Sequence, residues 1–376
     1  MSSPCPNKER CGSCAWSDVP YEQQLKQKLD EINGFFKLNG LDLMCENILP
    51  SPKTDHYRNR MDFVINFEGR VGMREKGAWW KVIDNHTCFL ADEQIDRLFP
   101  IVREWVQTSG LSFYDRKSHE GILRYAVIRC TSLGQTMINI ITSDPADQSE
   151  TVTEAMKLLN ESCRPSTLIH SINKTQTDVS FGEDIRVLYG PGFIEERIDG
   201  INYRISPNAF FQTNSFASPL LLQTVRKFCS DLSNKTLLDL YCGTGFFSIA
   251  LAKHAKSVIG VELSDEAIVD AKENALLNDL QNTQYISAKT EEFDWATYKP
   301  DVVILDPPRS GMHTKALADV LRIRPKEIIY VSCNPKIFAK ELIEFQKAYT
   351  VSQTQAIDQF PHTPHVELVT KLSLRA

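Results

Sequence analysis

Hydrophobic and polar positions follow one rhythm in the first half of the chain and another after about residue 206. In the first half, apolar residues at helical spacing predict helices over Pro20–Lys37 and Ile95–Thr108. Alternating positions predict paired strands over Gly121–Thr131 and Gln135–Thr142. We therefore expect this half to be a mixed α+β arrangement without internal repeats.

From Ser215 onward, short apolar strands alternate with amphipathic helices. Such alternation is typical of a parallel, doubly wound sheet, so the expected fold class is α/β with a Rossmann-like C-terminal domain. We expect three regions, residues 1–90, 91–205 and 206–376, of which the last is this domain. Its five principal strands are expected at Thr236–Leu240, Ser257–Val261, Thr283–Ala288, Val302–Leu305 and Glu327–Ser332, and two more strands close the chain.

The composition, 42% hydrophobic and 24% charged residues, supplies enough apolar material for sizeable cores. No apolar segment has the character of a signal peptide or the length of a membrane span. We therefore expect a cytoplasmic protein that has no membrane partner.

The net charge of −6 counts against nucleic acid as a partner, because nucleic-acid-binding domains are often basic. Basic clusters nevertheless occur, and Leu321–Lys340 holds five Lys and Arg residues against one acid. Such clusters are either solvated faces or parts of an RNA-binding surface. The charge pattern alone leaves both interpretations open.

A glycine loop follows the first strand of the C-terminal domain. Gly243-x-Gly245 opens a helix, and Glu262 at the end of the next strand suits the two hydroxyls of a ribose. The third glycine of the dinucleotide fingerprint is missing, which disfavours NAD, while a turn that only packs on the sheet remains an alternative. Asp239-x3-Gly243-x-Gly245 with Glu262 resembles motifs I and II of class I methyltransferases, which bind S-adenosylmethionine.

An acid and a thiol follow two further strands. Asp306-Pro-Pro-Arg309 and Cys333-Asn-Pro are expected at the carboxyl edge of the sheet, beside the glycine loop. A thiolate that adds to C6 of uracil turns the ring into an enolate, and C5 then attacks an electrophilic methyl group. The helix expected after Cys333 favours the thiolate through its positive end. The alternative for Cys333 is a buried, inert cysteine.

The reaction also requires a base that removes the C5 proton. His362, His365 and Glu367 lie just before the last strand, and Glu367 fits the role of general base best. Two histidines and a glutamate also permit a metal site, which stays open as an alternative.

Together these motifs resemble the RNA 5-methyluridine (uracil-C5) methyltransferase family, whose members modify 23S rRNA or the T-loop of tRNA. The match extends to Phe210-Phe-Gln-Thr-Asn214 and covers most of the chain. The resemblance implies a class I methyltransferase that transfers a methyl group from S-adenosylmethionine to C5 of a uridine in RNA. It makes Cys333 the nucleophile and Glu367 the general base, and it places at the cofactor Gln212, Tyr241, Gly243, Glu262 and Asp306.

Three of the ten cysteines fall within ten residues near the N-terminus, a density that indicates a metal site. The series Cys5-x5-Cys11-x2-Cys14 with Cys88 matches the [4Fe–4S] pattern of the same family. Zinc also accepts four thiolates, so the choice of an iron–sulfur cluster comes from the resemblance. Residues 1–90 are then the cluster-bearing region, and 91–205 the RNA-binding domain.

The RNA target is expected from a departure from the family pattern. Many members carry a small RNA-binding β-barrel, the TRAM domain, ahead of the first cysteine, and only four residues precede Cys5. This favours the TRAM-less type that methylates uracil 747 of 23S rRNA, with another rRNA site or the tRNA T-loop as alternatives. We expect a monomer.

Two other functions compete with this interpretation. An amino-methyltransferase acting on adenine or on a small molecule would use Asp306-Pro-Pro, but it has no need of a covalent Cys333. A non-catalytic RNA-binding iron–sulfur protein would need neither the thiol nor the glycine loop.

Overall fold

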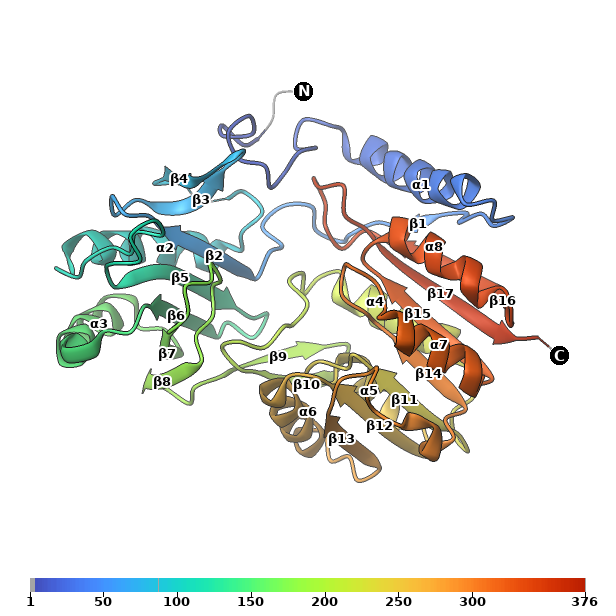
Figure 1. The fold of residues 1–376 in the computed structure, drawn as a ribbon. Coiled ribbons are helices and arrows are strands. Elements are labelled where there is room, and N and C mark those ends of the chain that lie inside the picture. Colours follow the sequence, from blue (N-terminus) through green and yellow to red (C-terminus); the bar gives the residue numbers. More distant parts are fainter. Residues whose placement is uncertain (1–3, 87, 376) are drawn as a thin grey trace. The chain divides into compact units, whose positions relative to one another are not determined.

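A computed structural model describes residues 4–86 and 88–375 and separates the chain into two compact units (Figure 1). Unit 1 comprises Met1–Asp18, Lys53–Glu196 and Arg204–Asn208. Unit 2 comprises Val19–Pro52, Arg197–Tyr203 and Ala209–Ala376. This division differs from the expected three regions, because the segment Val19–Pro52 packs with the C-terminal sheet.

Unit 1 is built on a seven-stranded sheet in the order β4-β3-β2-β5-β6-β7-β8. Helices α2 (Glu93–Thr108) and α3 (Ser149–Cys163) pack on it and on each other. Phe63 of the sheet and Phe99 of α2 lie in one apolar core with ring centroids 4.3 Å apart. The strands are β2 (Arg60–Ile65), β3 (Val71–Glu75), β4 (Ala78–Asp84), β5 (Leu123–Cys130), β6 (Thr136–Thr142), β7 (Thr167–Ile172) and β8 (Asp184–Tyr189).

Two short strands, β9 (Ile194–Ile198) and β10 (Ile201–Ile205), form a separate hairpin where the chain passes between the units. Its turn is Asp199-Gly200, and both turn residues have positive φ. Asp and Gly tolerate that conformation well, which suits them to this hairpin turn.

Unit 2 is an eight-stranded sheet in the order β1-β16-β17-β15-β14-β11-β12-β13. The strands from β15 to β13 are all parallel, whereas β17 is antiparallel to both of its neighbours. The expected parallel sheet is therefore a mixed one. The strands are β1 (Ile48–Leu49), β11 (Thr236–Leu240), β12 (Ser257–Glu262), β13 (Thr283–Ser287), β14 (Val302–Leu305), β15 (Glu327–Ser332), β16 (Tyr349–Ile357) and β17 (Glu367–Leu374).

Helices cover both faces of this sheet, as a doubly wound fold requires. Three of them, α1 (Tyr21–Leu38), α7 (Thr314–Ile323) and α8 (Pro335–Phe345), share an apolar core with one face. Helices α1 and α8 lie side by side (Figure 1). Within the core, Phe36 of α1 contacts Phe338 of α8, with ring centroids 6.5 Å apart. The remaining helices are α4 (Ser218–Phe228), α5 (Phe246–Ala252) and α6 (Asp265–Leu277).

Among the helices that residues 4–86 and 88–375 form, none is long and apolar enough to cross a membrane.

Candidate active site

The predicted site residues of unit 2 follow strands that are neighbours in the sheet. Leu240 of β11 pairs with Leu305 of β14, which pairs with Tyr330 of β15. Because these strands are parallel, the glycine loop, Asp306 and Cys333 all leave the same carboxyl edge. The edge on which the sequence predicted these groups is therefore confirmed.

The glycine loop fits the close approach of a ligand. Gly243 has φ +53, a left-handed conformation, and a Cβ added there would meet open space. Its N–H donates to Glu262 Oε2 at 3.2 Å, so the carboxylate at the end of β12 lies beside the loop. An acid in this place suits ribose hydroxyls, and the loop, Glu262 and the neighbouring Tyr241 thus fit the nucleoside part of S-adenosylmethionine.

Asp239 holds the loop against the next helix. It is fully buried, and its Oδ2 accepts from the N–H of Ser248 in α5 at 3.1 Å. Its Oδ1 is buried without a hydrogen-bond partner among the described residues. Burial raises the pKa of Asp239 to about 7. An orphaned carboxylate oxygen behind the glycine loop is consistent with a site that is completed by a bound ligand.

The reversed direction of β17 brings Glu367 to the nucleophile. Ser332 pairs with Leu368 across the antiparallel ladder, so Cys333 and Glu367 leave the same end of neighbouring strands. Glu367 is 6% exposed, whereas Cys333 is partly exposed. The structure therefore brings together the two residues that the sequence proposed for covalent chemistry.

These two groups share one electrostatic environment with Asp306 and Arg309. Burial, with the negative charges of Glu367 and Asp306, raises the pKa of Cys333 to about 11, while Arg309 opposes the rise. Burial and the charge of Asp306 raise the pKa of Glu367 well above its usual range. Burial and the charge of Asp239 raise the pKa of Asp306 to about 8. Arg309, part of the Asp-Pro-Pro-Arg motif, was not among the site residues predicted.

A cavity of about 280 Å³ opens at Cys333. Besides Cys333 it is lined by Arg309, by the start of α8, by His365, and by Glu31 and Phe35 of α1. The sequence placed α1 in the cluster-bearing region, and nothing in its apolar spacing indicated a place beside the nucleophile. The only local signal was polar residues, Gln24 and Lys28, on the buried face of the helix.

Those two residues fasten the loop that leads to Glu367. Lys28 Nζ donates to Asp358 Oδ1 at 2.6 Å in a fully buried ion pair, and also to the carbonyl of Phe360 at 3.0 Å. Gln24 Oε1 accepts from the backbone N–H of His362 at 2.7 Å, and its amide lies 3.1 Å from His362 Nδ1. His362 thus faces α1, and His365 faces the cavity.

Gln212 is buried in the segment before α4. Its neighbour Asn214 accepts from the N–H groups of Phe216 and Ala217, and donates to the carbonyl of Gln359 at 2.9 Å. The segment is therefore tied to the same loop that precedes Glu367. Phe210, two residues before Gln212, has a side chain that is 69% exposed.

The four N-terminal cysteines belong to unit 1, whereas the groups described so far belong to unit 2. Cys5, Cys11, Cys14 and Cys88 are all buried, and burial together with the charges of Cys5 and Cys88 raises the pKa of Cys14 to about 12. Cys5, Cys14 and Cys88 also lie in one apolar core. Among residues 4–86 and 88–375, however, no group of three or more His, Cys, Asp or Glu side chains is arranged to hold a metal ion. The structure gives the predicted cluster no direct support.

Known proteins resemble this chain along almost its whole length. The model of a family described as tRNA (uracil-5-)-methyltransferase matches residues 185–374. An uncharacterised RNA methyltransferase of Caldanaerobacter subterraneus is 40% identical over 98% of this chain and 84% of its own. The tRNA (uracil(54)-C(5))-methyltransferase of Pyrococcus horikoshii is 35% identical over 96% of this chain and 84% of its own.

A solved structure of a uracil-C5 methyltransferase has a similar fold. The tRNA (uracil-54, C5)-methyltransferase of Pyrococcus abyssi, in complex with S-adenosyl-L-homocysteine, superimposes with a TM-score of 0.79 and 33% identity, covering 99% of this chain and 87% of that one. Fold and site therefore define an S-adenosylmethionine-dependent RNA methyltransferase. Within that class, the chain belongs to the RNA uracil-C5 methyltransferase family that the sequence motifs resemble.

Proposed function

We propose that this protein methylates C5 of a uridine in RNA through a covalent bond between Cys333 and C6 of the uracil. One observation carries the proposal: Cys333 and Glu367 stand on neighbouring strand ends, at the edge that also bears the glycine loop. An amino-methyltransferase has no use for this pair, and neither has a protein that only binds RNA.

The chemistry assigns each group a role. Cys333 Sγ forms a bond to C6, and the electrons of the C5–C6 double bond move toward the C4 carbonyl oxygen. S-adenosylmethionine supplies the electrophilic methyl group that C5 receives. Glu367 then removes the C5 proton, the double bond re-forms, and the C6–S bond breaks to release the thiolate. The uracil must leave its base stack for Cys333 to reach it.

For the cofactor we propose the residues named from the sequence, with Glu262 at the ribose and Gly243 beneath the nucleoside. Tyr241 follows β11 directly, and Asp306 stands at the next strand end. Gln212 is assigned by resemblance, supported by its place in a segment fixed to the loop before Glu367.

For the target we propose uracil 747 of 23S rRNA, with the tRNA T-loop or another rRNA site as the alternative. The first target is the one expected from the family resemblance of the sequence. The activity named for the Pyrococcus relatives, at uracil 54 of tRNA, supports the alternative.

A direct test offers the purified protein unmodified 23S rRNA fragments and tRNA transcripts with labelled S-adenosylmethionine, and maps 5-methyluridine. We expect the label at uracil 747. Label confined to the T-loop would establish the alternative, and label at adenine or no label in any RNA would overturn the uracil-C5 proposal.

The pH dependence of the first chemical step follows from Cys333. A thiol with a pKa of about 11 is almost entirely protonated near neutrality, so the reactive thiolate increases about tenfold per pH unit below that value. We expect covalent capture of 5-fluorouridine RNA to accelerate from pH 6 to pH 9.

Arg309 lowers the pKa of Cys333, so Arg309→Met should slow capture and shift the pH profile of capture to higher pH, while Arg309→Lys restores most of the rate. A flat profile would contradict the assignment.

We also propose that Cys5, Cys11, Cys14 and Cys88 hold a [4Fe–4S] cluster, supported by the resemblance of their spacing to the family pattern and by their burial in unit 1. Methyl transfer from S-adenosylmethionine to C5 requires no electron from such a cluster, so its contribution is to the folding of unit 1. Anaerobically prepared protein should contain about four iron and four sulfide ions per chain and absorb in the visible range. Cys14→Ala should lose both signals and Cys163→Ala, a partly exposed cysteine of the same unit, should keep them. Zinc in place of iron, or full iron in Cys14→Ala, would defeat the proposal.

A further inference from the structure

Unit 1 contains a second cavity, which none of the sequence motifs predicted. Its volume is about 550 Å³, and its lining includes residues of β4, the edge strand of the seven-stranded sheet. Aromatic side chains from β4, from the β2–β3 turn and from the segment before β5 line it together with two cations: Phe67, Trp79, Trp80, Tyr114, Arg116 and Lys117.

The aromatic walls of this cavity are open to solvent. Phe67 is 51% exposed, Trp79 51% and Trp80 49%. The two indole rings stand nearly perpendicular, at 87°, with centroids 5.8 Å apart, so they form two sides of a corner. Three half-exposed aromatic rings around one cavity are a contiguous apolar patch, and such a patch indicates a binding surface.

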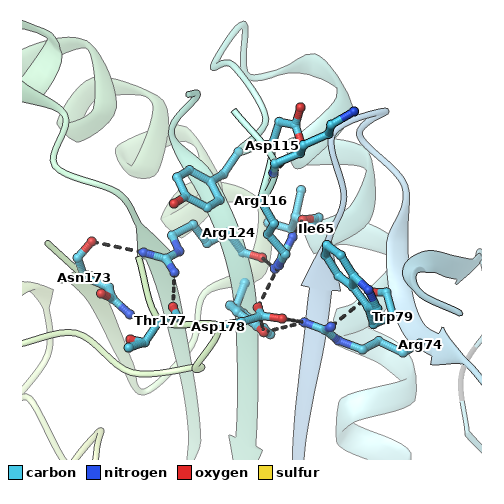
Figure 2. A network of polar contacts seen from close by, with 12 residues as sticks. Ile65, Arg74, Trp79, Asp115, Arg116, Arg124, Asn173, Thr177 and Asp178 are labelled. Carbon is cyan, nitrogen blue, oxygen red and sulfur yellow. Dashed lines mark hydrogen bonds and ion pairs between the residues drawn. The ribbon is translucent and has the colours of Figure 1, made fainter. Parts of the chain in front are cut away.

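A network of ion pairs and hydrogen bonds lies behind the aromatic side chains of the cavity. Figure 2 shows Asp178 between Arg74 and Arg116. Arg116 Nε donates to Asp178 at 2.7 Å, and Arg74 uses one nitrogen for Asp178 and another for the carbonyl of Trp79 at 3.1 Å. The carboxylate thereby fixes the backbone that carries the tryptophans. Desolvation would raise the pKa of Asp178, but hydrogen bonds from Arg116 and Tyr125 and the charge of Arg116 lower it to about 2.

Cationic side chains lie both in the cavity wall and in the network behind it. Arg124 is fully buried and donates to the carbonyls of Asn173, Thr175 and Thr177. The cavity wall itself holds two cations, Arg116 and Lys117, and one acid, Asp115, and Arg116 is paired with Asp178. A site that joins aromatic walls to cationic side chains is complementary to a polyanion that carries flat rings.

We propose that this cavity binds an unpaired nucleobase of the substrate RNA, other than the uridine that is methylated. The base stacks on one of the Trp79 and Trp80 rings with its edge against the other, and Lys117 contacts an adjoining phosphate. This assignment rests on the proposed function, because it takes the RNA substrate as its ligand. Aromatic stacking accepts any base, whereas cations at the rim recognise the backbone, which is how single-stranded nucleic acid is held without sequence readout. The volume lies within the range of pockets that enclose small ligands.

The test compares RNA binding by single variants. Trp79→Ala and Trp80→Ala should each weaken binding of the substrate RNA by about five- to a hundredfold, the usual effect of removing one stacking ring, with Trp80→Phe in between. Under steady state, the KM for RNA should rise while kcat at saturating RNA stays unchanged. The control is Tyr189→Ala, which removes an aromatic ring 50% exposed on β8, the opposite edge strand of the same sheet. Unfolding midpoints of all variants establish that unit 1 is intact.

Two further measurements do not depend on methylation. Lys117→Ala should reduce the slope of log Kd against log salt by about 0.7 to 1, as expected for one phosphate contact. RNA containing 4-thiouridine at unpaired positions should cross-link to Trp79 or Trp80 on irradiation.

The outcomes separate the two proposals. If both tryptophan variants bind and methylate RNA like the native chain, the cavity is not an RNA site, a protein partner becomes the better candidate, and the uracil-C5 function stands. If the native chain binds and cross-links RNA at the cavity but methylates none, the proposed function fails while the binding site remains.

Discussion

Replacing Cys333 with alanine is expected to lower methyl transfer to uridine C5 by about 10⁴-fold or more, because no other group in the site can add to C6. C5 of uracil is a poor nucleophile until that addition makes the ring an enolate. The variant should still bind RNA, since the thiol is a small part of the contact surface. The measurement is methyl incorporation from labelled S-adenosylmethionine, with a denaturing gel for the covalent adduct on 5-fluorouridine RNA.

A matched control distinguishes chemistry from loss of a cysteine. Cys229 is also partly exposed and also in unit 2, but it follows α4 and lies near Glu327, at the amino end of β15. Cys229→Ala should therefore keep its activity and form the adduct. Normal methyl transfer by Cys333→Ala would end the covalent proposal and favour an amino-methyltransferase.

The position of Cys333 could be predicted from the sequence, because it depends only on the order of strands and helices along the chain. Strands that alternate with helices lie parallel, and their carboxyl ends meet at one edge. Asp306, Cys333 and the glycine loop each follow such a strand directly, so their proximity needed no knowledge of distant contacts. The apolar run of β17, by contrast, does not encode its direction, and it is the antiparallel pairing that brings Glu367 to the thiol.

Contacts between distant segments lay outside what the sequence shows. Lys28 and Asp358 form a buried ion pair although they are 330 positions apart, and the residues next to each of them in the sequence do not predict that pairing. For the same reason α1 was assigned to the N-terminal region, although its apolar face packs on α8 of the catalytic unit. Strand β4 escaped prediction because its exposed Trp79 and Trp80 break the alternation of buried and exposed residues.

Replacing Glu367 with glutamine is expected to stop the reaction at a later point than the loss of Cys333. Glutamine has nearly the same size as glutamate, but its amide cannot accept the C5 proton as the carboxylate does. Methyl transfer then proceeds once per enzyme molecule, and the C5 proton stays in place. Turnover should fall by about 10²- to 10⁴-fold, the usual contribution of a general base. Burial and the charge of Asp306 raise the pKa of Glu367, which makes its carboxylate a stronger proton acceptor than an exposed glutamate.

The adduct that accumulates identifies the step that is blocked. With ordinary uridine RNA, Glu367→Gln should retain a methylated RNA–protein species on a denaturing gel, whereas the native chain releases its product and Cys333→Ala forms no adduct. Glu327→Gln is the control, since Glu327 is a buried glutamate at the opposite end of β15 and pairs with Lys371. A Glu367→Gln variant that turns over normally would move the base to another group, and His365, which lines the cavity at Cys333, would be the next to replace. A variant that forms no adduct at all would instead place Glu367 in the addition step, as the group that receives the proton of the thiol.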